Sequence, residues 1–137
     1  MILLNPSEVF DSFWATALQD AQMSEDDAAC SENREPEQFH GEPVAEYGAR
    51  YRATVESICA AAEPILAELN LHEFPRRLGE SSLSEVFGGD LYLTAVGHGA
   101  GFWDGDWWPA GDALTALAKA MPGGSLAQHK DGGLFFM

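Results

Sequence analysis

The chain has 137 residues, of which 22 are Asp or Glu and 7 are Lys or Arg, so its formal net charge is −15. This balance excludes direct nucleic-acid binding and adhesion to anionic membranes, because both depend on clusters of Lys and Arg. No apolar run approaches the ~20 residues that span a bilayer, and the short apolar start at residues 1–4 lacks the pattern of a secretory signal.

Residues 6–21 are predicted to form an amphipathic helix that opens at Asn5 and Pro6. Apolar residues recur there at spacings of three and four, which is typical of one face of a helix. They are Val9, Phe10, Phe13, Trp14, Ala17 and Leu18. Because the face carries three aromatic side chains, we expect other elements to cover it.

Residues 22–42 are predicted to be an acidic loop, because the apolar period stops and Pro36, Gly41 and Pro43 punctuate the chain. Residues 1–46 hold eleven acidic residues and one basic residue, Arg34. A function that uses a negative field therefore belongs to this third of the chain. The candidate partner-binding acids are Glu25, Asp26, Asp27, Glu32, Glu35 and Glu37. The spacing of these acids does not fit a calcium loop.

Residues 43–69 keep helical spacing throughout and are predicted to form a second, long helix that stops at Asn70. Pro43 suits its first turn. Pro64 does not suit its interior, because proline removes a hydrogen-bond donor and clashes with the preceding turn. We therefore expect a kink or a break near Glu63.

The carboxyl half is predicted to alternate short elements. Residues 81–85 form a capped helical turn that ends at Gly88–Gly89, and residues 90–104 form a β-hairpin around a glycine turn. Asp112 caps a helix over 113–121, and a second hairpin joins 125–128 to 133–136. The whole chain, 1–137, is then a single α+β domain whose N-terminal helices pack on a small antiparallel sheet.

His98 is the main candidate for a catalytic or metal-binding residue, because it lies on the predicted glycine turn and is close in sequence to Asp104 and Asp106. A histidine beside carboxylates acts as a general base or contributes to a metal site. The alternative is that the glycine turn is a folding element. Trp107 and Trp108 leave the same choice open, between an exposed binding platform and core filling.

No other catalytic or metal pattern is present in the sequence. The glycines precede a predicted strand and so form no phosphate loop, and no nucleophile elbow occurs. The four histidines are too dispersed for a preset zinc site. Cys30 and Cys59 make no disulfide framework, so we expect free thiols in a reducing compartment. We expect no enzyme activity, cofactor or catalytic metal.

Two stretches, Gly89–Thr94 and Gly97–Asp104, resemble a signature of small acidic bacteriophage proteins. In that signature the aromatic–Leu–Thr segment is a strand, and a helix opened by Gly–Asp and a closing Asp–Gly hairpin follow; Gly111–Thr115 and Lys130–Leu134 match these. The resemblance covers residues 88–137. Its motif positions are Gly97, His98, Gly99, Gly101, Trp103 and Asp104. The resemblance implies a viral origin and the host cytoplasm, and implies no particular activity.

These observations favour a phage-encoded acidic binding protein that modulates or inhibits a host nucleic-acid-handling or defence complex without catalysis. As an anti-CRISPR-like DNA mimic it presents carboxylates to a basic host surface that normally binds phosphates. One alternative is a structural or accessory phage protein that acts through an oligomeric or aromatic interface, such as a homodimer. The other is a small enzyme that uses His98 and Asp104.

Overall fold

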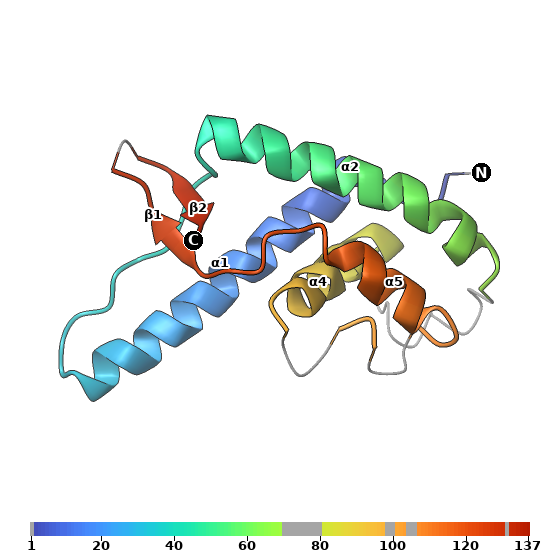
Figure 1. Cartoon of the computed structure of the whole chain (residues 1–137). Coiled ribbons are helices and arrows are strands. Elements are labelled where there is room, and N and C mark those ends of the chain that lie inside the picture. Colours follow the sequence, from blue (N-terminus) through green and yellow to red (C-terminus); the bar gives the residue numbers. More distant parts are fainter. Residues whose placement is uncertain (1, 70–80, 98–100, 104–106, 131) are drawn as a thin grey trace.

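The computed structural model describes residues 2–69, 81–97, 101–103, 107–130 and 132–137. Within these ranges the chain forms four helices and one two-stranded antiparallel sheet (Figure 1). The helices are α1 (Pro6–Ser31), α2 (Ala45–Ala67), α4 (Leu83–Ala95) and α5 (Gly111–Ala118), and the strands are β1 (Leu126–Gln128) and β2 (Leu134–Phe136). The predicted α+β class with C-terminal strands is confirmed.

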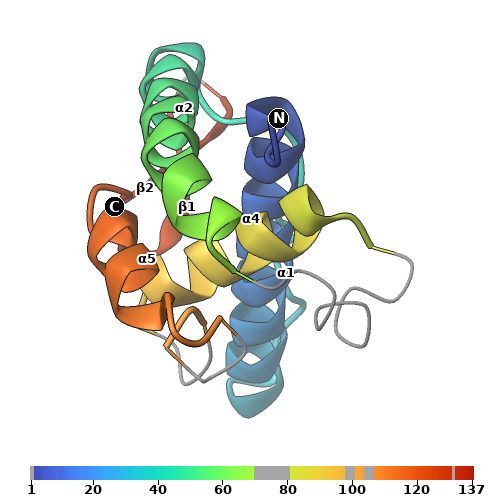
Figure 2. The ribbon, with the colours of Figure 1, turned by 90° about the vertical axis from the view of Figure 1, so that its right-hand side faces the viewer.

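Helix α1 begins where the sequence predicts, but it ends ten residues beyond the predicted end at residue 21. Asn5 caps it by accepting hydrogen bonds from the N–H groups of Ser7 and Glu8 at 3.0 and 3.3 Å. The helix then continues to Ser31, so residues 22–31 of the predicted loop are helical. This second half of α1 extends beyond the other helices (Figures 1 and 2). It has little core to contact, which is why its apolar period fades although its residues remain helical.

Helix α2 runs through Pro64 as one helix, so of the predicted kink or break near Glu63 the break is wrong. The proline lies in the last two turns and its side chain is exposed. It cannot bond the carbonyl of Ala60, four residues earlier, so the helix continues there with one backbone hydrogen bond fewer. Glu63, the residue before it, instead anchors the N-terminal segment: its carboxylate accepts the backbone N–H groups of Leu3 and Leu4, at 2.8–3.0 Å. Asn70, the predicted stop, lies outside the described residues.

Helix α4 replaces the first predicted hairpin. Ser82 caps it by accepting from the N–H of Glu85 at 3.1 Å, as predicted, but the helix passes through Gly88–Gly89 to Ala95. The predicted strand over 91–96 is therefore wrong. Phe87, Leu91 and Tyr92 are buried, and a short buried apolar run has the same sequence signal in a helix as in a strand.

Helix α5 and the C-terminal hairpin follow the prediction more closely. The residue at the N-cap is Ala110, which has no side-chain bond, and Asp112 lies in the first turn, so the predicted Asp112 cap is wrong. The hairpin is confirmed, with Leu126 opposite Phe136 and Gln128 opposite Leu134. Pro43 adds a parallel bridge to Leu134, which ties the segment before α2 to β2. No helix in the described part of the chain meets the length and hydropathy needed to cross a membrane.

Phe136 lies at the centre of an aromatic core that joins the hairpin to three helices. Its ring is 5.4–6.5 Å from the rings of Phe13, Trp14, Tyr51 and Tyr92. Its N–H also donates to the Tyr51 hydroxyl at 3.0 Å. Figure 2 shows α4 between α1 and α5, and the contacts between α1 and α4 form the largest helix–helix interface of the fold.

Candidate binding surface

The motif region around residues 90–107 is a folded structural unit in its described parts. Trp107 is 0% exposed and packs against Phe87 and Phe102, with ring centroids 5.8 and 5.4 Å away. Its indole N–H donates to the buried carboxylate of Asp90 at 2.6 Å. The sequence left open whether Trp107 is part of an exposed binding platform or fills the core. Trp107 fills the core, so its prediction as a partner-binding residue is wrong.

Thr94 holds the chain that follows α4 back against the helix. Its hydroxyl donates to the carbonyl of Asp90 at 2.7 Å and accepts from the N–H of Phe102 at 2.9 Å. Gly101 has a φ of 139°, and a β-carbon there would overlap the Thr94 hydroxyl oxygen. Gly97 also has a positive φ, of 72°. These two motif glycines thus adopt backbone conformations that are unfavourable for other residues. His98, Gly99, Asp104 and Asp106 lie outside the described residues.

Two other tryptophans of this region face solvent. Trp108 is 79% exposed and Trp103 is 52% exposed. The sequence reading of Trp108 as a surface residue is compatible with this position. These side chains are separate from the acidic candidates, which belong to α1 and to the segment after it.

The six acidic candidates gather around the end of α1 and the segment 32–42, which we call the strap. Arg34 binds Glu25 through two hydrogen bonds of 2.9 Å and also pairs with Glu32. The N–H of Glu37 donates to the same Glu25 carboxylate at 2.7 Å. These bonds, the Arg34 side chain first, lower the pKa of Glu25 to about 2. Glu25 thus fastens the strap to α1.

The strap is held along its length by three further contacts. The side chain of Gln22 donates to the carbonyl of Glu37 at 3.0 Å and accepts from the N–H of Phe39 at 2.9 Å. The Trp14 indole donates to the carbonyl of Gly41 at 2.8 Å. The strap therefore returns along α1 in a fixed path, and its remaining carboxylates point outward. The exposed acids of this group are Asp26, Asp27, Glu32, Glu35 and Glu37.

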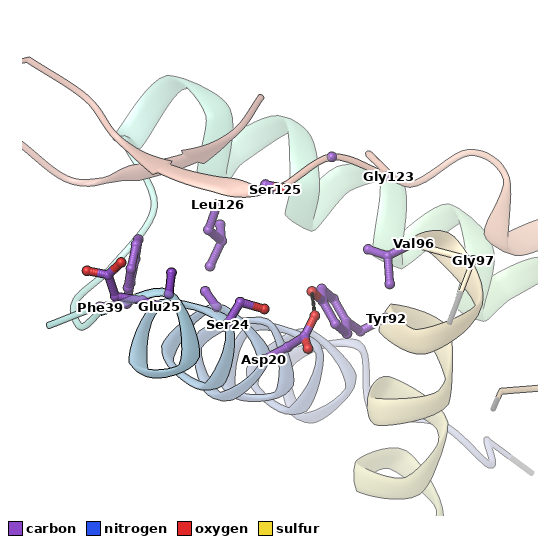
Figure 3. A pocket seen from close by; sticks show the side chains of 13 residues that line it. Asp20, Ser24, Glu25, Phe39, Tyr92, Val96, Gly97, Gly123, Ser125 and Leu126 are labelled. Atoms are coloured by element: carbon purple, nitrogen blue, oxygen red, sulfur yellow. Dashed lines mark hydrogen bonds between the residues drawn. The ribbon is translucent and has the colours of Figure 1, made fainter. Parts of the chain in front are cut away.

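A cleft of about 590 Å³ lies beside the strap, between the second half of α1, the end of α4 and residues 123–126 (Figure 3). Asp20 and Tyr92 meet in it: the Tyr92 hydroxyl donates to the Asp20 carboxylate at 2.6 Å. Burial, together with this bond, raises the pKa of Tyr92 well above its ordinary value. The hydroxyl therefore stays protonated and acts as a donor to Asp20.

Among the residues that the structure describes, the charged side chains that line the cleft are acidic. They are Asp20 and Glu25, and no Lys, Arg or His of the described ranges lines it. Phe39 stands at the end near Glu25, and Val96 and Gly97 stand at the other end (Figure 3). Sequence reasoning missed Asp20 and Tyr92, because they are 72 residues apart and no motif joins them.

Neither a search for metal-binding groups nor a comparison with known proteins assigns a function to this surface. In the ranges that the structure describes, no three His, Cys, Asp or Glu side chains are grouped so that they could hold a metal ion. Comparison of the chain with protein-family models, curated proteins and solved structures finds no match.

Proposed function

We propose that this protein is a small acidic binding protein that acts without catalysis, by covering a basic surface of a partner protein that otherwise holds nucleic-acid phosphates. The observation that carries the proposal is the outward carboxylate group at the end of α1 and along the strap. Carboxylates spread over one surface present a negative field to such a groove and raise the rate of association with it.

The placement of the nearby cations supports this proposal. Arg34 is held by Glu25 and Glu32 within the fold. Arg50 stacks over Tyr47 and Arg52 over Phe10, with the guanidinium carbons 4.7 and 4.2 Å from the ring centroids. None of these bases pairs with Asp26 or Asp27 among the ion pairs of the described residues. The charge of those two carboxylates is thus available to a partner.

The partner we propose is a host complex that handles nucleic acids or defends against phages. This part rests on the resemblance of residues 88–137 to small acidic phage proteins, which implies a viral origin and action in the host cytoplasm. The resemblance supports only the viral origin and the host setting, and the acidic surface supports the mode of binding. On these two grounds we favour an inhibitor of the DNA-mimic type over a protein that is acidic only for solubility.

A second candidate is an accessory protein that acts through an aromatic interface, and Trp103 and Trp108 favour it. Two large aromatic side chains exposed near each other in the sequence are typical of interface hot spots. In this alternative the interface joins two copies of the chain or the chain and another phage protein. Trp108→Ala would then abolish the association, whereas charge changes on the strap would leave it intact.

Competition with DNA tests the proposed function directly. Host proteins retained on DNA-cellulose are mixed with the immobilised wild-type chain at about 0.1 M salt, where exposed charges still interact over about 10 Å. We expect one or a few of them to bind, to be released by excess duplex DNA, and to lose affinity for labelled duplex when the chain is added. Binding that duplex DNA does not displace would contradict the proposal.

A further inference from the structure

We propose that the cleft between α1 and residues 123–126 receives an arginine side chain of the partner, with Asp20 as its anchor. The inference deepens the proposed function and rests on it, because only a partner with a basic surface supplies such a side chain. The hydrogen-bonding capacity of Asp20, the groups that line the cleft beside it and the charge of the lining support this assignment.

Asp20 has hydrogen-bonding capacity left over. An ionised carboxylate offers about four lone-pair sites, and within the described part of the chain Asp20 accepts one hydrogen bond, from the Tyr92 hydroxyl. Tyr92 is buried, and its bond fixes the direction of the half-buried carboxylate. The free oxygen and the remaining lone pairs are thus held ready for an incoming donor.

The other lining groups suit a guanidinium. Ser24 supplies a hydroxyl oxygen, and Phe39 supplies aromatic surface at the end of the cleft near Glu25 (Figure 3). Guanidinium groups make forked hydrogen bonds to a carboxylate, which an ammonium does less well. Glu25 contributes less, because Arg34 already neutralises it. Asp20 is therefore the carboxylate on which recognition depends.

The cleft also adjoins the exposed acids of the strap. Glu25 belongs both to the cleft lining and to the bonds that hold the strap. A basic partner drawn to the strap by its charge thus arrives beside the cleft, where one of its arginines enters. This arrangement favours a side chain of a macromolecule over a free organic cation, and a free diamine serves as the control ligand.

The test is an NMR titration of the full chain with three probes. They are a short blocked peptide with one central arginine, the same peptide with citrulline, and putrescine. We expect the arginine peptide to shift the amide signals of Ala21, Gly97, Gly124 and Ser125, which line the cleft. The citrulline peptide, which is uncharged, and putrescine should shift them far less.

Two matched variants locate the anchor. Asp20→Asn removes the charge and keeps an oxygen that accepts from Tyr92, and we expect the arginine peptide to bind it about tenfold more weakly. Asp11→Asn removes the same charge from an exposed position of α1 outside the cleft and should bind as the wild type does. The wild-type shift map needs no variant, so it stands even if Asp20→Asn folds poorly.

Three results would overturn the inference: no shifts localised to the cleft, equal shifts from the citrulline peptide, or tighter binding of putrescine. Failure of the proposed function is a separate result. If the arginine peptide binds the cleft while no DNA-binding protein is displaced from duplex, the cleft assignment stands and the proposed partner class is wrong. If DNA displaces a bound host protein but the arginine peptide causes no shifts in the cleft, the proposed partner class stands and the cleft assignment is wrong.

Discussion

Gly88 of α4 lies directly against the backbone carbonyl of Val9 in α1. A β-carbon at Gly88 would overlap that carbonyl oxygen and would come within 2.8 Å of the Ser12 β-carbon. The hydroxyl of Ser12 also donates to the carbonyl of Glu85 at 2.5 Å. The glycine thus lets two helix backbones approach closely at the crossing of α1 and α4, and it does not end a helix.

This relationship predicts opposite effects for two adjacent glycines. Gly88→Ala should lower the free energy of unfolding by about 1–3 kcal/mol, because the methyl group forces the helices apart. Gly89→Ala should raise it by about 0.5–1 kcal/mol, because alanine is the better helix former, and its β-carbon meets the Thr16 and Ser12 hydroxyl oxygens at ordinary distances of 3.5 and 4.0 Å. Urea unfolding measures both. Equal effects at the two positions would contradict the crossing geometry.

Trp107 and Trp108 provide a second matched pair. Trp107→Ala should cost about 3–5 kcal/mol of stability, because it empties a core site and removes the donor to Asp90. Trp108→Ala should change stability by about 0.5 kcal/mol or less, as is usual at the surface, since this side chain is 79% exposed. Thermal unfolding followed by circular dichroism separates them. A stable Trp107→Ala protein would show that this core site is dispensable.

The sequence predicted elements well where their signals are local. The start of α1 at Asn5, the capped turn over residues 81–85 and the C-terminal hairpin all depend on neighbouring residues, and all three are confirmed. The long helix over 43–69 was predicted within two residues at each end. Such signals need no knowledge of the tertiary fold.

The prediction failed where tertiary packing decides the structure. Gly88–Gly89 followed by the apolar run 91–96 indicates a break and a strand. In the fold Gly88 lets α1 approach closely, and the helix continues to Ala95 with Leu91 and Tyr92 buried. Residues 22–31 lack an apolar period because α1 extends there beyond the core. The pairing of Asp20 with Tyr92 likewise arises only from the crossing of two helices, so no local pattern could reveal it.

Glu25 should titrate far below its ordinary range. Its pKa of about 2 lies below the ordinary 4.5, so the carboxylate contributes its full stabilisation of the strap above about pH 4.5 and loses it as the pH falls through about 2. The carboxyl carbon signal of Glu25, followed by NMR, should therefore have its midpoint near pH 2.

Arg34→Gln is the control for this titration. Removal of the guanidinium takes away the largest cause of the lowered pKa, so the Glu25 midpoint should rise towards 4.5 and the N–H of Glu37 should exchange faster with solvent. If the midpoint of the wild-type chain lay near 4.5 already, Arg34 would not fasten the strap to α1.

The last prediction concerns which charges draw the partner. Glu25 and Glu32 are engaged with Arg34, so reversing them would disturb the strap as well as the charge. Asp26 and Asp27 are exposed on α1 and pair with no cation among the described residues, although Asp26 accepts a hydrogen bond from Gln22 at 2.9 Å. The double variant Asp26→Lys/Asp27→Lys should lower stability by about 1 kcal/mol or less and weaken capture of DNA-binding host proteins by about tenfold or more at about 0.1 M salt.

The dependence on salt and on position completes this prediction. The loss should shrink at about 0.5 M salt, because screening by then removes most attraction between exposed charges. Asp11→Lys/Glu68→Lys makes the same charge change at two exposed positions away from the strap and should weaken capture much less. The opposite pattern, in which the Asp26 and Asp27 reversal leaves capture intact and Trp108→Ala abolishes it, would place recognition on the exposed tryptophans. The acidic surface would then serve solubility alone, and the partner would be bound through an apolar hot spot.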